Sequence, residues 1–224
     1  MNVIIVSLAG FSVTASAFAF GAAKLFRKKK PLYFQLYVLA CGCIMLERLI
    51  ELAAAICETE AGGMTAAGFF GMLSFALFIL SANRGTLDGI VDDRREGRNR
   101  RARLLALAAP AVTAPLVVAD VLVHAGKTTP ASGILLFIAL IPVIPASYYN
   151  LKHLLLPMDE IGLLRATRPC NVFALLFLTV NTAFDLLSVI SAEFAVTAVC
   201  SIGSAVLAAL LVAGAVKGEK RWKI

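Results

Sequence analysis

Residues 24–57 read KLFRKKKPLYFQLYVLACGCIMLERLIELAAAIC, and this stretch decides the fold. A cluster of Lys and Arg is followed by Pro31 and then by a mostly apolar run from residue 32 to residue 57. Such a run exceeds the roughly 20 residues that a helix needs to cross a bilayer. Its apolar residues are continuous rather than alternating, which excludes a strand of a membrane barrel. Because hydrocarbon offers no partner for backbone N–H and C=O groups, the stretch predicts a transmembrane helix.

The same pattern recurs along the whole chain. Of its 224 residues 60% are hydrophobic and 16% charged, whereas soluble domains have about 45–50% apolar and about 25% charged residues. We place membrane spans at residues 3–23, 32–57, 65–83, 103–124, 131–150, 169–190 and 193–216. The tightest turn is expected near Ser191–Ala192. The predicted fold class is an all-α membrane protein, a single seven-transmembrane-helix bundle over residues 1–224.

The basic residues predict the orientation of the spans. Nineteen of the 21 Lys and Arg residues fall in residues 24–30, 84–103, 152–168 and 217–223, which seven spans would place on one side. By the positive-inside rule that side is the cytoplasm, so the N-terminus is outside, the C-terminus inside, and Arg84 to Arg101 cytoplasmic. No basic residue precedes the first apolar run, which argues against a cleaved signal peptide. We expect a multi-pass protein of the cell membrane whose charge of +7 faces the headgroups of the lipid bilayer rather than nucleic acid.

Ionisable residues inside spans are costly and suggest a functional site. The second span carries two acids one turn apart with an arginine between them, the fourth carries an acid one turn before His124, and the sixth carries an amide and an acid one turn apart. All come late in spans that run from inside to outside, so they share a depth in the outer half of the membrane. We expect an outward-facing acidic cavity suited to a cation or an amine. The predicted ligand-binding residues are Glu47, Arg48, Glu51, Asp120, Asn181 and Asp185.

Equal spacing singles out two of these acids. Glu47 lies sixteen residues after Pro31, and Asp185 lies sixteen residues after Pro169, each proline being preceded by a basic residue. We predict that Glu47 and Asp185 face each other across the bundle and line one cavity. The match also favours a repeat of a three-helix unit about a linking span, with parts at residues 1–83, 103–124 and 131–216. The alternative is an interhelical lock, in which the acids pair with Arg48 and bind no ligand.

Prolines predict irregular helices in two of the spans. Pro110 and Pro115 interrupt the fourth span, and Pro142 and Pro145 interrupt the fifth. A proline inside a helix removes a backbone hydrogen bond and usually kinks the helix. We expect static kinks that aid packing at these positions.

The sequence favours a transporter or channel for a small cationic or polar solute. The alternative is a receptor-like sensor that signals through a separate cytoplasmic protein partner. An enzyme is least favoured, because the chain contains no Ser-His-Asp set, P-loop or HExxH motif. The seventh span lacks the lysine of a retinal Schiff base, and His124 and His153 are too few for a multi-histidine zinc site. We therefore predict no catalytic residue, cofactor or metal site, and the oligomeric state is left open.

Overall fold

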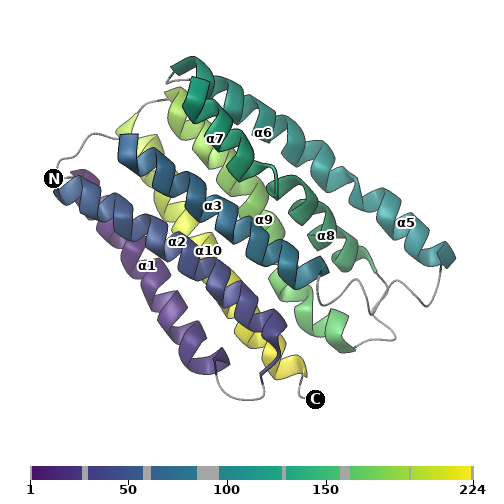
Figure 1. The fold of residues 1–224 in the computed structure, drawn as a ribbon. Coiled ribbons are helices and arrows are strands. Elements are labelled where there is room, and N and C mark those ends of the chain that lie inside the picture. Colours follow the sequence, from purple (N-terminus) through teal and green to yellow (C-terminus); the bar gives the residue numbers. More distant parts are fainter. Residues whose placement is uncertain are drawn as a thin grey trace.

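The computed structural model describes residues 2–26, 30–57, 62–84, 96–127, 130–156, 162–191 and 193–222, and within these ranges it is helical without strands. Its helices are α1 (Asn2–Leu25), α2 (Leu32–Ile56), α3 (Gly62–Ala82), α5 (Glu96–Ala106), α6 (Ala108–Lys127), α7 (Pro130–Leu140), α8 (Val143–Leu155), α9 (Gly162–Ser191) and α10 (Phe194–Trp222). In Figure 1, α6 continues α5 and α8 continues α7, and the helices lie side by side in an elongated bundle. The two termini lie at opposite ends of the bundle. The predicted all-α class is confirmed.

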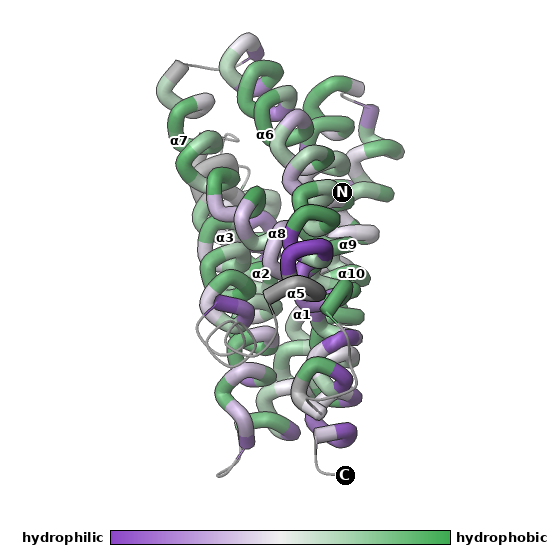
Figure 2. Tube along the Cα trace, turned by 90° about the vertical axis from the view of Figure 1, so that its right-hand side faces the viewer, coloured by the Kyte–Doolittle hydropathy of each residue, from purple (hydrophilic) through white to green (hydrophobic). Residues whose placement is uncertain are grey.

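The surface of this bundle is apolar. Five helical stretches are long and apolar enough to cross a membrane: Asn2–Leu25, Arg100–Lys127, Gly133–Leu155, Leu164–Ser191 and Phe194–Trp222. The side chains of Leu122 and Val199 are 66% and 67% exposed, which water would penalise and lipid tails would not. Figure 2 shows hydrophobic residues along most of the helices, with hydrophilic ones concentrated at α5 and near the C-terminus. The chain is therefore built as a multi-pass helical membrane protein.

The last two helices extend beyond their predicted spans. α9 begins at Gly162, seven residues before the predicted start, and α10 continues to Trp222, six residues past the predicted end. Backbone hydrogen bonding does not stop at the lipid surface, and Arg, Lys and Leu favour helix in water as well. The predicted turn near Ser191–Ala192 is confirmed, because α9 ends at Ser191 and α10 begins at Phe194.

Two predicted loops are shorter in the structure than in the prediction, because the helices on either side continue beyond the predicted membrane spans. The break from Lys152 to Arg168 is helical up to Leu155 and again from Gly162, and the loop from Arg84 to Arg101 is helical from Glu96 onward. Residues 85–95 and 157–161 lie outside the described residues.

Two of the predicted irregularities are breaks in the helix. The helix is interrupted at Leu107, three residues before Pro110, and again at Ile141–Pro142. Pro110 has no N–H to donate to the carbonyl four residues earlier. The chain instead forms a tighter turn, in which Leu107 N–H donates to the Leu104 carbonyl at 3.2 Å. Pro115 lies within α6 without ending it.

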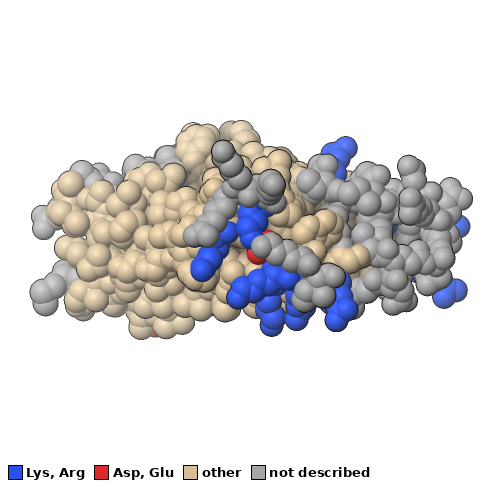
Figure 3. Space-filling model, turned by 90° about the horizontal axis from the view of Figure 1, so that it is seen from below, with Lys and Arg blue, Asp and Glu red and all other residues tan. Residues whose placement is uncertain are grey.

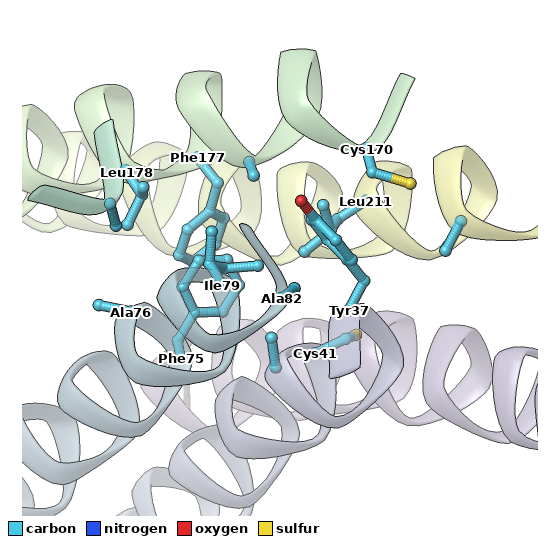
Figure 4. Close-up of a cluster of buried hydrophobic side chains, with 14 of the residues drawn as sticks. Tyr37, Cys41, Phe75, Ala76, Ile79, Ala82, Cys170, Phe177, Leu178 and Leu211 are labelled. Carbon is cyan, nitrogen blue, oxygen red and sulfur yellow. The ribbon is translucent and has the colours of Figure 1, made fainter. Parts of the chain in front are cut away.

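Helices α2 and α9 each pack against three other helices. α2 packs against α1, α3 and α10, while α9 packs against α6, α8 and α10. Figure 4 shows Phe75 and Ile79 of α3 directed toward Phe177 of α9. The rings of Phe75 and Phe177 are tilted, with centroids 4.1 Å apart, and both side chains are fully buried. The middle of the bundle is therefore closed by apolar side chains.

The helix ends that carry basic residues meet at one end of the bundle. α1, α3, α8 and α10 end there, and α2 and α9 begin there (Figure 1). Lys30 before α2 forms an ion pair with Glu219 near the end of α10. In Figure 3, Lys and Arg gather in the middle and right of the view, whereas the described residues at its left are mostly uncharged. We call this the basic end.

Candidate functional site

A cavity of about 350 Å3 lies at the end of the bundle opposite the basic end. Its wall comes from α1, α2, α3, α6, α9 and α10, and it reaches the first turns of α1 and α10 at Val3 and Thr197. Five of the six predicted binding residues line it: Glu47, Arg48, Glu51, Asn181 and Asp185. The structure thus brings Glu47 and Asp185 to one cavity, although their role in binding stays a prediction.

Arg48 is held firmly at the wall of this cavity. Its Nη1 donates to Glu51 Oε2 at 2.7 Å and to Ser201 Oγ at 3.2 Å, and its Nη2 donates to Ser204 Oγ at 3.2 Å. Glu47 is more distant, with Oε1 3.9 Å from Nη2. Residues one apart on a helix do not face each other, whereas residues three apart do. Arg48 is therefore neutralised mainly by Glu51 of its own helix and fixed to α10 by two serines.

An amide extends this network to two more helices. Ser204 Oγ donates to Asn181 Oδ1 of α9, and Asn181 Nδ2 donates to Met72 Sδ of α3 at 3.8 Å. The guanidinium of Arg48 thereby links α2, α10, α9 and α3 through uncharged groups. This arrangement explains why the cavity holds its shape on the side toward the apolar middle of the bundle.

Glu47 is wedged between α2 and α3. Its side chain is 12% exposed, and a β-carbon added at Gly71 would lie 2.2 Å from its Oε2 and 2.9 Å from its Cβ. At Gly68 the corresponding β-carbon would lie 3.9 Å from Oε1, an ordinary contact. A glycine at position 71 is therefore what lets α3 approach the carboxylate closely.

Asp185 lines the cavity from α9 without a bonded cation. Ser188 Oγ donates a hydrogen bond to the backbone carbonyl of Asp185 at 2.8 Å. Within the described part of the chain, no hydrogen bond to the Asp185 carboxylate is found. The carboxylate itself is left facing the cavity. Glu47 and Asp185 are thus the two cavity acids that form no close ion pair with Arg48.

Asp120 does not line the cavity. It is fully buried in α6, with Oδ1 3.0 Å from Nδ1 of His124. The same ring nitrogen lies 3.1 Å from the Asp120 carbonyl oxygen. His124, one turn further along, is the residue that reaches the cavity. Asp120 is thus set one turn behind the cavity wall and contacts His124, and its role in binding stays a prediction.

Sequence reasoning missed the contribution of α10. Thr197, Ser201 and Ser204 all line the cavity, and two of them bind the guanidinium. Single hydroxyl residues are common in membrane helices and give a weak signal. Their spacing of four and then three residues, which places them on one helix face, was the signal available.

No known protein family, curated protein or solved structure gives a significant match to this chain. The residues that line the cavity are therefore the basis for inferring what it binds. In the ranges that the structure describes, no three His, Cys, Asp or Glu side chains converge as metal ligands would. Three carboxylates and one guanidinium, together with the imidazole of His124 that contacts Asp120, surround a small cavity and offer a site for a compact organic cation.

Proposed function

We propose that the chain is a transporter that carries a small organic cation across the cell membrane. The observation that carries the proposal is the charge around the cavity. Glu47, Glu51 and Asp185 line it, and among the described lining residues Arg48 is their guanidinium counterpart. Counted as ionised, three carboxylates against one guanidinium leave an excess of negative charge that a cation would neutralise.

Size and solvation favour a compact solute. A cavity of about 350 Å3 is at the small end of the roughly 300–1,000 Å3 typical of ligand pockets. Charges attract more strongly where the surroundings are less polar than water. A cation of a few heavy atoms, such as an alkylammonium or methylguanidinium ion, would fit between the acids and replace its lost hydration with carboxylate contacts.

The contacts of Arg48 argue against a purely structural role for the acids. A lock between helices would pair the arginine with a carboxylate of another helix. Here the near carboxylate is Glu51 of the same helix, and the links to α10 are hydroxyl groups. Glu47 is 3.9 Å from Arg48 and Asp185 forms no ion pair with it in the described structure, so neither acid holds the arginine as closely as Glu51 does. Acids buried in a membrane protein without a close partner are costly and favour a functional role.

The proposal includes seven crossings with the N-terminus outside and the C-terminus in the cytoplasm. Its support is the basic end, where the helix ends next to nineteen of the 21 Lys and Arg residues meet. Cys57 is exposed at the opposite end of the bundle, so the five native cysteines are first replaced by alanine. A cysteine at the exposed position Arg100 of that protein should then react with a membrane-impermeant maleimide only in inverted vesicles. Labelling of Arg100→Cys in intact cells would overturn the topology.

Uptake into proteoliposomes tests the function. Wild-type protein should accumulate radiolabelled methylguanidinium, whose charge does not depend on pH near neutrality, and should bind it in detergent. The double variant Glu47→Gln with Asp185→Asn should lose both while keeping its thermal unfolding transition. Glu193→Gln, which changes an exposed acid at the start of α10 that does not line the cavity, is the matched control.

The same measurement separates the transporter from a membrane sensor. A sensor would bind methylguanidinium without accumulating it, and would need a cytoplasmic protein that co-purifies. Binding without uptake would therefore end the transporter proposal.

A further inference from the structure

Three helices present the same order of layers from the cavity toward the basic end. Each contributes one residue to the cavity, then apolar residues, then a buried polar residue. The cavity residues are Glu47 on α2, Met72 on α3 and Asn181 on α9, and the buried polar residues are Tyr37, Asn83 and Asn171 of the same three helices. Each pair is ten or eleven residues apart, which is roughly 15–17 Å along a helix. The polar residues of the inner layer therefore lie at one depth on the helices that wall the cavity.

These inner residues form one hydrogen-bonded group. The phenol oxygens of Tyr33 and Tyr37 are 2.7 Å apart, and they donate to Asn171 Oδ1 at 3.2 and 2.8 Å. Asn83 Nδ2 donates to Tyr37 Oη and to Asn150 Oδ1, each at 3.2 Å. We call this group the amide–phenol cluster; its members are Tyr33, Tyr37, Asn83, Asn150, Asn171 and His153, whose Nδ1 lies 2.7 Å from Asn83 Oδ1.

The cluster is more deeply buried than the cavity. None of its six side chains is more than 3% exposed. Asn171 Nδ2 has no hydrogen-bond partner among the described residues, and such an unpaired buried donor is costly. Asn83, its central member, directly follows the last residue of α3. An apolar core would be simpler to build here.

A thin apolar layer separates the cluster from the cavity. Phe75 and Phe177 stack across it, with Ile79 and Leu178 beside them, and all four are fully buried (Figure 4). Figure 4 also places Tyr37 and Cys170 on the far side of this layer from Leu178. A path between the two polar regions would need these two aromatic rings and the apolar side chains beside them to move apart.

We propose that the amide–phenol cluster is a second, transient binding site for the same organic cation, reached when Phe75 and Phe177 separate. This inference rests on the proposed transport function. The phenol and amide oxygens of the cluster, which bond to one another in this structure, would exchange those bonds for N–H groups of the solute, and the cluster lacks the carboxylates of the cavity. Conduction requires sites that bind well enough to admit a solute and weakly enough to release it. The acidic cavity captures the cation, and the cluster passes it toward the basic end.

Variants of the cluster test the inference separately from capture. Asn171→Leu removes an acceptor shared by both tyrosines. It should leave methylguanidinium binding in the cavity within about two-fold of wild type and lower uptake by about ten-fold or more. The control is Thr182→Val on the same helix, whose buried hydroxyl bonds only the Leu178 carbonyl of its own helix in the described structure. Wild-type uptake by Asn171→Leu would overturn the second site while leaving the transporter proposal intact.

A chemical probe follows the opening itself. Two single-cysteine proteins are made, one keeping Cys170 beside the cluster and one keeping Cys41, whose thiol points to the Thr14 carbonyl of α1. Both thiols are fully buried. Methylguanidinium should raise the rate of N-ethylmaleimide labelling at Cys170 by about ten-fold, a shift of roughly 1.4 kcal/mol in opening, and leave Cys41 unchanged. Uptake that proceeds without any change at Cys170, or equal labelling of both thiols, would overturn the inference.

A wild-type protein that binds methylguanidinium but does not accumulate it would instead overturn the proposed function itself. That failure is seen before any variant is made, so the two outcomes cannot be confused.

Discussion

The cavity and the amide–phenol cluster are two polar regions that share helices α2, α3 and α9, and they are built differently. The cavity carries charged groups that keep some exposure, with the side chains of Glu47 and Glu51 12% and 19% exposed. The cluster consists of phenols, amides and one imidazole, and Tyr37 and Asn83 are 0% exposed. Cluster residues bond to one another, whereas Asp185 faces the cavity without a bonded cation in the described structure.

This difference matches the cost of burying each kind of group. A charged side chain at the centre of a membrane helix costs about 2.5–3.5 kcal/mol on insertion scales, whereas uncharged polar groups that bond across helices stabilise by about 0.6 kcal/mol each on average. The charged side chains line the cavity, where a solute cation can reach them. The uncharged hydrogen-bonding side chains of the cluster lie deeper in the bundle. Substitutions that remove a charged or a hydrogen-bonding group from either region test whether the two regions differ in function as they do in structure.

The largest effect should come from removing the cavity arginine. Arg48→Met leaves Glu51 without its 2.7 Å partner and Ser201 and Ser204 without a donor. Losing one member of a buried ion pair costs about 3–5 kcal/mol, so the free energy of unfolding in detergent should fall by that amount. Adding Glu51→Gln to Arg48→Met should restore part of it. If Arg48→Met unfolds like wild type, the cavity is not stabilised by this pair.

The next effect separates two acids of the same cavity. Asp185→Asn should weaken methylguanidinium binding by about ten-fold or more, or roughly 1.4 kcal/mol, without loss of thermal stability, because no bonded cation is lost. Glu51→Gln should instead lower the thermal unfolding temperature, because Arg48 is left with a weaker partner. Binding titrations and unfolding curves on both variants decide the matter. A stability loss in Asp185→Asn equal to that in Glu51→Gln would show that both acids are structural.

A smaller effect should follow from crowding Glu47. Gly71→Ala places a methyl group against the carboxylate and its β-carbon, at 2.2 and 2.9 Å, so α3 must move away from α2. Overpacking of this kind costs about 1–3 kcal/mol, and cation binding should weaken with it. Gly68→Ala is the matched control, since its nearest contact of 3.9 Å needs no movement. Equal stability and binding in the two alanine variants would mean that Glu47 is not held as the structure shows.

Much of the architecture could be predicted from the sequence, because membrane spans follow from the length of apolar runs. The same depth argument brought Glu47 and Asp185 to one cavity. On α6 the cavity reaches His124 but not Asp120, which lies one turn deeper on the same helix face. How deep the cavity extends along each helix depends on packing between distant segments, which the local sequence does not encode.

The amide–phenol cluster shows the other limit of sequence reasoning. Tyr33 and Tyr37 are one turn apart and Asn171 lies inside an apolar run, but uncharged polar residues in spans are too common to mark a site. Only the structure shows that four helices bring them together. The sequence also could not show that Arg48 pairs closely with Glu51 rather than with Glu47. That pairing depends on side-chain geometry within one helical turn.

A small loss of stability is expected from a substitution in the cluster, and it tests the comparison most directly. Tyr37→Phe removes one hydroxyl and keeps the ring, so Asn171 retains the bond from Tyr33, and Asn83 retains its bond to Asn150. Hydrogen bonds between membrane helices average about 0.6 kcal/mol, and the unfolding free energy should fall by no more than about 1.5 kcal/mol. A path residue should then show uptake reduced far more than stability. If Tyr37→Phe instead costs as much stability as Arg48→Met, the cluster locks four helices together, and the path must run elsewhere.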